Sequence, residues 1–449
     1  MERIFHDRIM DADAIVIGAG AAGLAAARSL ARLSLRVIVV EARDRVGGRV
    51  WWRNMTQAKA PVELGAEFIH GPAEHTMVLL REAGLTAVAT GGEGWTCSKN
   101  GELRRDDKNF ALASRALKAA HSLAKDESAE QFLRRLEKDE ATRQMAEAAR
   151  AFVEGFEAAD PAIASARAIA DELRSGVDST SARPVGGYGP MFEHLHNACV
   201  AAGAQMFLST VVRRISWRPR AVEVDVRDPR GESRTIRARA AIVTLPVGVL
   251  RHSGDETEVA FNPELPSVKR EALRNIEMGQ VVKVTLFFRT AFWERIHNGR
   301  HRDGAFFRCG GHPFTGYWTQ FPERNDLIVA WAGGPKAIAL RDARQTEVIE
   351  RAMNGFGALL NEPTLVRKEF EGGAMHDWDH DPFARGAYSY LVVGGQRARG
   401  ALAAPLDQTL FFAGEATSTD DQGGTVNGAL ETGERAAREV AMSLGIPAT

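Results

Sequence analysis

The sequence predicts an α/β protein of two domains: a Rossmann-like dinucleotide-binding domain and a second domain of the α+β type. Three stretches carry this prediction: a strand, glycine-rich turn, helix and strand near the start, an Ala-, Arg-, Glu- and Leu-rich stretch over 105–180, and short strands from residue 205 onward. A chain of 449 residues is also too long to fold around one ordinary hydrophobic core, and its length fits two or three domains.

The first strand–helix–strand unit follows from three short runs. Residues 14–17 are apolar throughout, as in a buried parallel strand. Residues 24–33 are rich in Ala and Leu without Gly or Pro, which favours a helix, and 35–40 form a second apolar strand. Together they predict a βαβ unit.

Three glycines and one acid complete a dinucleotide fingerprint. Gly18, Gly20 and Gly23 have the spacing G-x-G-x-x-G, which permits a tight turn, close approach of the backbone to a pyrophosphate, and close packing of helix on strand. The phosphates then face a helix N-terminus. Glu41 lies 18 residues after Gly23, where a carboxylate can accept hydrogen bonds from ribose hydroxyls.

The residues after Glu41 extend this site. The run Ala42-Arg43-Asp44-Arg45-Val46-Gly47-Gly48-Arg49 places a glycine pair between arginines, which suits backbone amides and guanidinium groups around a pyrophosphate. A simple nicotinamide site does not need such an extension.

This segment resembles the flavin-containing amine oxidase family, whose members share E-A-R-x-R-x-G-G-R after the first βαβ unit. The resemblance implies FAD as the cofactor. Monoamine oxidases of the family attach FAD through a cysteine where this chain has Ala387, so noncovalent FAD is expected.

Two further segments follow the family. Residues 62–71 look like the segment that passes beside the flavin in polyamine oxidases, with His70 toward the substrate, although a lone loop histidine is by itself more often solvated.

In the strand over 278–287, Lys283 shares a face with Val281 and Thr285. A strand lysine is ordinarily a solvated edge residue. The resemblance instead implies that Lys283 holds a water against flavin N5 and assists reoxidation by oxygen, where a cation stabilises developing negative charge.

The C-terminal part carries the remaining motifs. The resemblance places Trp378 and Tyr388 beside the isoalloxazine, although aromatic residues are otherwise mostly core. Gly414-Glu415 resembles the second flavin motif, and a helix beginning beyond 424–426 would direct its amides at flavin N1 and O2. In the family, Tyr388 matches one wall of an aromatic cage around the substrate. Monoamine oxidases have a second cage tyrosine where this chain has Thr425, so the site looks closer to those of polyamine oxidases and flavin histone demethylases. The demethylases have long additional domains, for which this length leaves little room.

The candidate residues form two groups and include no metal ligands. The expected catalytic residues are Lys283, Tyr388, Trp378 and His70. The expected cofactor-binding residues are Gly18, Gly20, Ala21, Ala22, Gly23, Glu41, Ala42, Arg43, Gly48, Arg49, Gly65, Ala66, Glu67, Phe68, Val212, Trp378, Gly414, Glu415, Gly424, Thr425 and Val426.

The FAD-binding domain is expected to be discontinuous. Its expected segments are 10–85, 190–255 and 385–449, with a Gly- and Pro-rich turn over 184–190 marking a crossing between domains. Residues 86–189 and 256–384 are expected to form the substrate-binding domain, with a helical insertion.

Composition indicates which partners and which cellular compartment to expect. A net charge of −1 gives no electrostatic reason to expect nucleic acid or an anionic membrane, and no run of about 18 apolar residues indicates a membrane span. The charged N-terminus lacks the apolar run of a signal peptide. Cys97, Cys199 and Cys309 are far apart and odd in number, which favours free thiols and a cytoplasmic location. The oligomeric state is left open, a homodimer being one alternative.

The resemblance implies a reaction. Hydride would pass from the carbon beside a neutral amine to flavin N5, the imine would hydrolyse to an aldehyde, and O2 would be reduced to hydrogen peroxide. The partners are then a small-molecule amine, a mono- or polyamine, and O2.

One alternative is an L-amino acid oxidase, which needs an arginine to bind the substrate carboxylate. No arginine occurs in 65–71, but Arg308 could reach the site. Another is a flavin-binding protein without turnover.

Overall fold

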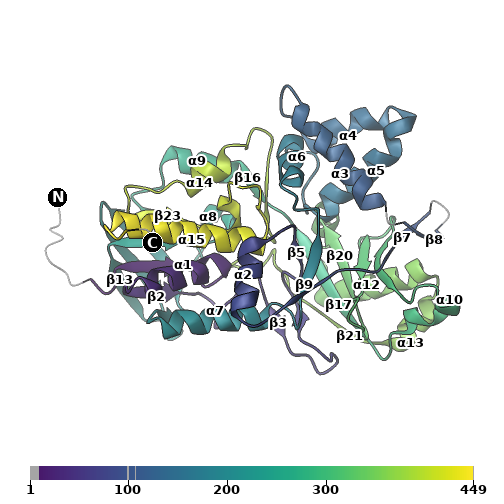
Figure 1. The fold of residues 1–449 in the computed structure, drawn as a ribbon, viewed down its shortest axis with the longest axis horizontal. Helices are drawn as coiled ribbons and strands as arrows, with labels where there is room; N and C mark the ends of the chain where they lie inside the picture. The colour runs from purple at the N-terminus through teal and green to yellow at the C-terminus, as the bar shows by residue number, and fades with distance from the viewer. Residues whose placement is uncertain (1–9, 99–100, 107, 448–449) are drawn as a thin grey trace. The chain divides into compact units, whose positions relative to one another are not determined.

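The computed structural model describes residues 10–98, 101–106 and 108–447. The chain divides into two compact units (Figure 1). The first comprises Met1–Gly48, Met191–Ile276 and Arg397–Thr449, and the second comprises Arg49–Pro190 and Glu277–Gln396. These bounds differ from the expected ones at four places: residues 49–85, residue 190 and residues 385–396 belong to the second unit, and 256–276 belong to the first.

The first unit is built on a five-stranded parallel sheet with the order β10-β2-β1-β14-β23. Its strands are β1 (Ala14–Ile17), β2 (Val37–Val40), β10 (Gln205–Phe207), β14 (Ala240–Val243) and β23 (Leu410–Phe412). The first strands are buried along their whole length, as the apolar runs predicted. This parallel sheet confirms the expected α/β, Rossmann-like class.

Helices pack on this sheet. In the first unit, α1 (Ala21–Arg32) and α15 (Val426–Ser443) lie side by side (Figure 1). They approach closely, since a Cβ added at Gly433 would lie 2.2 Å from the carbonyl oxygen of Ala22. Glycine therefore lets α15 contact the first turn of α1.

A four-stranded sheet with the order β13-β12-β11-β15 completes the first unit. Its strands are β11 (Val211–Arg218), β12 (Ala221–Arg227), β13 (Ser233–Ala238) and β15 (Ala260–Asn262). The unit's other helices are α7 (Gly189–Ala201), α8 (Val247–Arg251), α9 (Ser267–Arg274), α14 (Ala398–Ala403) and η3 (Glu415–Thr417). The first two residues of α7 are the last two of the Arg49–Pro190 segment of the second unit.

The second unit is organised by a seven-stranded sheet with the order β21-β17-β20-β19-β18-β7-β8. Its strands are β7 (Glu93–Cys97), β8 (Leu103–Arg105), β17 (Val281–Phe288), β18 (Gly304–Arg308), β19 (Gly316–Trp318), β20 (Leu327–Gly333) and β21 (Phe370–Met375). One face packs on α12 (Gln345–Leu360), with Val284, Leu286 and Phe356 in the shared core. The opposite face carries Lys283, as the alternation predicted.

The predicted helical stretch forms α3 (Asn109–Lys118), η1 (Ala119–Ser122), α4 (Ala129–Glu137), α5 (Glu140–Gly155) and α6 (Ala166–Arg174). These helices share a core of their own, with the buried side chains of Leu117, Leu133 and Phe152. The shorter elements are α2 (Glu74–Glu82), η2 (Phe292–Glu294), α10 (Ile296–Gly299), α11 (Pro335–Ile338), α13 (Pro363–Glu369), β3 (Trp52–Arg53), β4 (Val62–Glu63), β5 (Ile69–His70), β6 (Ala87–Ala89), β9 (Ser181–Pro184), β16 (Ile276–Met278) and β22 (Ser389–Leu391).

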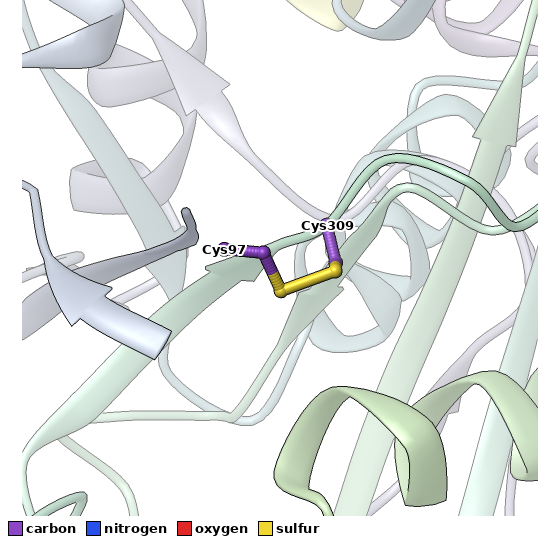
Figure 2. Close-up of a disulfide and its surroundings, with 2 residues drawn as sticks. All are labelled: Cys97 and Cys309. Carbon is purple, nitrogen blue, oxygen red and sulfur yellow. A yellow bond between two sulfur atoms is a disulfide. The ribbon is translucent and has the colours of Figure 1, made fainter. Parts of the chain in front are cut away.

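The expectation of three free thiols is wrong. Cys97 and Cys309 form a disulfide at the ends of β7 and β18 (Figure 2). These strands are parallel neighbours, with Thr96 opposite Arg308, so the next residue on each strand comes within bonding reach although 212 residues separate them. Cys199 alone is a free, buried thiol, and burial raises its pKa to about 11.

Within the described residues, no helix is both long and apolar enough to cross a membrane.

Candidate active site

The glycine fingerprint forms a close junction of strand, turn and helix in the first unit. Gly18 adopts a φ of +105°, and a Cβ at Gly23 would lie 1.9 Å from the carbonyl oxygen of Gly18, so both positions require glycine. Gly20 is the N-cap of α1, and no side chain caps this helix end. The amides of the first turn, from Ala21 to Gly23, therefore remain available for an anion.

Glu41 closes the fingerprint from the end of β2. Its side chain is buried and accepts hydrogen bonds from the backbone N–H of Ala19 at 2.7 Å and of Arg43 at 2.9 Å. Burial raises the pKa of Glu41, although these two bonds oppose the shift. A carboxylate accepts about four hydrogen bonds, so capacity remains for ribose hydroxyls.

The loop after Glu41 folds back onto the fingerprint. The N–H of Gly47 donates to the carbonyl of Ala19 at 2.9 Å, and Gly47 forms a bridge with Gly20. Arg45 donates to the carbonyls of Val46 and Gly48, at 3.1 and 3.0 Å, which fixes the loop from within. The predicted cofactor residues Ala42, Arg43 and Gly48 thus lie in a loop held beside the N-terminus of α1.

The backbone near Val212 is tied to the same strand end. The N–H of Thr210 donates to the carbonyl of Glu41 at 2.8 Å, and that of Ser209 to Arg43 at 2.7 Å. Val212 follows on β11 and is buried. This arrangement suits the predicted backbone contact with an adenine.

The second predicted flavin motif is held by a buried carboxylate. Glu415 accepts a hydrogen bond from the N–H of Gly424 at 3.0 Å, and Arg399 lies 3.9 Å from the same carboxylate oxygen. Thr425 is the N-cap of α15 and accepts a hydrogen bond from the N–H of Gly428 at 2.9 Å. Glu415 therefore positions the entry to α15, whose first residue is Val426.

These features fit a dinucleotide cofactor. The uncapped first turn of α1, the glycine contacts that leave no room for a side chain and the partly satisfied Glu41 carboxylate are all in the first unit.

In the second unit, Lys283 makes a buried ion pair. Its ammonium group lies 2.7 Å from Glu67 and donates to the carbonyl of Gly65 at 3.0 Å. Both charged side chains are only 4% and 6% exposed, respectively, which overturns the solvated-edge alternative. An ion pair this buried persists because further hydrogen bonds satisfy its members.

Glu67 supplies those bonds by accepting from three more groups on one oxygen. Arg183 donates to it at 2.8 Å, Trp318 at 3.0 Å and Gln320 at 3.1 Å. Burial would raise the pKa of Glu67, but the charges of Lys283 and Arg183 outweigh it and lower the pKa to about 2. Glu67 is therefore a carboxylate at neutral pH, and its side chain contacts Lys283, a role beyond the cofactor contact that the resemblance implied.

Trp378 packs against the same turn. Its indole N–H donates to the carbonyl of Leu64 at 3.0 Å. A Cβ at Gly65 would lie 1.9 Å from the carbonyl oxygen of Arg49 and 3.1 Å from Trp378. The N–H of Ala66 donates to that Arg49 oxygen at 3.2 Å. The predicted residues Arg49, Gly65, Ala66, Lys283 and Trp378 therefore meet at one turn.

Ala387 and Tyr388 immediately precede β22 in the second unit. The Tyr388 hydroxyl donates to the carbonyl of Phe156 at 2.6 Å, and Arg49 donates to the carbonyl of Ala387 at 2.8 Å. Burial raises the pKa of Tyr388. The ring is thus a neutral, fixed aromatic surface.

His70 lies among aromatic rings. Its ring centroid is 4.9 Å from that of Phe156 and 5.7 Å from that of Phe68. Burial lowers the pKa of His70 to about 4, so the imidazole is neutral at pH 7. Because Phe156 also accepts the Tyr388 hydrogen bond, His70 and Tyr388 share a neighbour.

Sequence reasoning missed Glu63, Arg183 and Phe156. Glu63 and Glu67 stand four residues apart in Val62-Glu63-Leu64-Gly65-Ala66-Glu67, and this pair of acids in an otherwise apolar run was the available signal. Arg183 belongs to a strand distant in sequence, and nothing local marks it as a partner of Glu67.

The dinucleotide fingerprint in one unit and the buried lysine–carboxylate pair beside aromatic residues in the other fit the class of dinucleotide-dependent oxidoreductases. The sequence model of the family described as "Flavin containing amine oxidoreductase" matches residues 21–441. The chain therefore belongs to the flavin-containing amine oxidoreductase family. Its cofactor is a flavin, and a flavin bound at a dinucleotide fingerprint is FAD.

Curated relatives agree with this family, and solved structures show the same fold. The chain is 28% identical to Polyamine oxidase 4 of Oryza sativa subsp. japonica, over 96% of this chain and 90% of that protein. It is 27% identical to Lysine-specific histone demethylase 1 homolog 2 of the same organism, over 96% of this chain but 57% of that protein. Among solved structures, a putrescine oxidase bound to putrescine has a TM-score of 0.78 at 22% identity, covering 96% of this chain and 99% of that one. Cyclohexylamine oxidase from Brevibacterium oxydans has a TM-score of 0.79 at 22% identity, covering 97% and 100%.

Proposed function

We propose that this protein oxidises small-molecule amines at the carbon bonded to nitrogen and passes the electrons to O2. Per turnover, an amine, O2 and water become a carbonyl compound, ammonia or a smaller amine, and hydrogen peroxide. The observation that carries the proposal is the buried Lys283–Glu67 pair at the Gly65 turn, in a chain of the flavin-containing amine oxidoreductase family.

The first unit would hold the cofactor. The first turn of α1 and the loop over 42–48 would bind the pyrophosphate, Glu41 the ribose, and Val212 the adenine by its backbone. The rest of the cofactor would bind at Gly414, Glu415 and the start of α15. Ala387 has no nucleophilic side chain, which supports noncovalent attachment. When bound, FAD accepts hydride from the amine and later gives the electrons to oxygen.

Lys283 would supply fixed positive charge for the oxygen step. Glu67 and the carbonyl of Gly65 hold the ammonium group in one position, so little reorganisation is needed when negative charge develops nearby. Glu67 in turn is held by Arg183, which keeps the carboxylate from moving with its partner. The lysine thus acts by position and charge.

Tyr388, Trp378 and His70 would border the substrate. Their rings are uncharged at neutral pH, because burial raises the pKa of Tyr388 and lowers that of His70. An aromatic, uncharged surrounding disfavours an alkylammonium ion and so favours the neutral amine that can be oxidised. Phe68 and Phe156 extend this surface beside His70.

The cysteines and the net charge bear on the compartment and the partners. The disulfide removes the argument from cysteines for a reducing compartment. A near-zero net charge supports small-molecule partners over nucleic acid or membrane.

The test separates the two half-reactions in the FAD-loaded enzyme. The enzyme is mixed anaerobically with monoamines, polyamines and L-2-amino acids in separate experiments. Monoamines or polyamines should bleach the oxidised flavin band, and L-2-amino acids should not. Lys283→Met should slow reoxidation by O2 at least about tenfold, since a lost charge contact is worth roughly 1.5–3 kcal/mol, with a smaller effect on bleaching.

Lys336→Met is the matched control, because Lys336 is a half-exposed lysine paired with Glu154 in the same unit. It should leave both half-reactions unchanged. Bleaching by L-2-amino acids alone would favour the L-amino acid oxidase alternative, and a flavin that no amine or amino acid bleaches would favour a binding protein without turnover.

A further inference from the structure

One row of residues crosses the sheet of the second unit from Lys283. Lys283 on β17 pairs with Trp331 on β20, Trp331 with Gly316 on β19, and Gly316 with Arg308 on β18. Residues directly opposite each other on neighbouring strands point to the same face. Arg308 therefore lies on the Lys283 face of the sheet, away from the α12 core.

This face is aromatic between the two cations. Phe306 and Trp318 occupy the adjacent row, and Phe306 packs 6.1 Å from Phe68 between ring centroids. Trp331 donates its indole N–H to the carbonyl of Gly155 at 2.8 Å, which fixes its ring. Gly316 adds no side chain to the row, so nothing from β19 separates Trp331 from Arg308.

Arg308 is a half-buried cation, and the Asp106 carboxylate acts on it through space. In the part of the chain that the structure describes, its side chain makes no hydrogen bond or ion pair; its guanidinium lies 5.8 Å from the ring centroid of Phe306. Burial lowers the pKa of Arg308, and Asp106 opposes this shift only through space. A desolvated guanidinium that no carboxylate contacts directly among the described residues is costly, which is a physical reason to expect an anionic ligand.

The position of Arg308 is fixed by its strand neighbours. The disulfide joins the next residue, Cys309, to Cys97, and the N–H of Cys309 donates to the carbonyl of Thr315 at 3.1 Å. The backbone of Arg308 is thus anchored on a braced strand end, and a guanidinium there offers planar, bidentate donors to a carboxylate.

We propose that Arg308 is a carboxylate-binding subsite for the far end of the substrate, so that the favoured amines carry a carboxylate several bonds away from the oxidised carbon. The proposal rests on the proposed function and names its substrate class. Three strand spacings, about 14 Å, separate the Cα atoms of Lys283 and Arg308. A 2-amino acid, whose two groups share one carbon, is too short to span this row, and a polyamine would bring a second cation toward Arg308.

The experiment compares three linear substrates of equal chain length in the FAD-loaded enzyme: an alkylamine, an α,ω-diamine and an ω-amino carboxylic acid. Anaerobic bleaching gives an apparent Kd and a limiting rate for each. The amino acid should bind at least about tenfold more tightly than the alkylamine, the value of a charge-assisted hydrogen bond. Arg308→Gln should abolish this preference, and Arg308→Lys should retain part of it.

Controls and a second readout keep the test independent of turnover. Arg104→Gln removes an exposed arginine, paired with Glu102 on the edge of the same sheet, and should keep the preference. Titration of oxidised flavin with linear alkanoates, followed by absorbance, should show binding that Arg308→Gln weakens at least about tenfold.

The outcomes separate the two proposals. If alkylamines bleach the flavin but the amino acid has no advantage, or Arg308→Gln keeps it, the subsite is wrong and the amine oxidase function stands. A preference for the diamine would equally overturn the subsite. If no amine bleaches the flavin but alkanoates bind in an Arg308-dependent way, the proposed function fails and the carboxylate subsite is supported.

Discussion

Glu63 and Glu67 show how position decides the charge of two acids in one short segment. Glu67 lies against Lys283 and Arg183, and its pKa is lowered to about 2. Glu63 accepts one hydrogen bond, from the N–H of Tyr188 at 2.6 Å, and burial raises its pKa to about 7 against the weaker effect of Lys283. Its other oxygen has no hydrogen-bond partner among the described residues.

The raised pKa makes Glu63 a source of pH-dependent stability. The folded state binds this proton more tightly than the unfolded state, so its contribution is complete below pH 4.5 and is lost as pH rises through about 7. Glu63→Gln removes this dependence and keeps an oxygen for the Tyr188 N–H. The free energy of unfolding of the variant, relative to the native protein, should therefore increase between pH 4 and pH 8 by roughly 3 kcal/mol at most.

Urea unfolding across this pH range measures the difference. Glu264→Gln is the control, since it makes the same change at a side chain that is 83% exposed. A difference for Glu63→Gln that does not vary with pH would show that Glu63 titrates near its ordinary value in the folded protein.

Among the elements, β7 and β18 are joined twice, by their parallel pairing and by the Cys97–Cys309 disulfide. Because the bond closes a loop of 212 residues, it restricts the unfolded chain strongly, by up to roughly 5 kcal/mol in the loop-entropy description. Its loss would leave the strand pairing and the core under β18 in place. The bond therefore acts mainly on the stability of the second unit.

We expect the Cys97→Ser, Cys309→Ser double variant to fold with a lower Tm while binding FAD normally. Calorimetry with and without reductant measures the effect, and reductant should lower the Tm of the native protein but not of the variant. Thiol titration in denaturant without reductant should find the one free thiol, Cys199. Three titratable thiols per native chain would show that the disulfide does not form.

The elements were predictable wherever a signal lies within one segment. β1, α1 and β2 follow from an apolar run, a glycine turn and an Ala- and Leu-rich stretch, each read within a few residues. The contact of Lys283 with Gly65 spans 218 residues, and the disulfide spans 212. Strand order decides such contacts, and periodicity reports only which face a residue occupies. The family resemblance marked Lys283, but Arg183 and the disulfide needed the sheets themselves.

On the scale of the whole molecule, the candidate residues are divided between two units with separate cores. The predicted dinucleotide contacts lie largely in the first unit, from stretches that begin at Gly18, Val212 and Gly414. Lys283, Trp378 and the other aromatic residues lie in the second. A cofactor that binds the folded first unit, and not the unfolded chain, stabilises that unit by mass action.

Noncovalent FAD therefore predicts a Tm that depends on the concentration of free FAD. At a thousandfold excess over Kd, the stabilisation should approach about 4 kcal/mol, and cofactor-free protein should unfold at a lower temperature. Differential scanning calorimetry over a series of FAD concentrations measures this, with riboflavin, which lacks the pyrophosphate and adenosine, as the control ligand. Acid denaturation should release all yellow colour into the supernatant, because Ala387 offers no attachment. Colour that remains with the precipitated protein, together with a Tm independent of added FAD, would contradict noncovalent binding and point to attachment at another side chain.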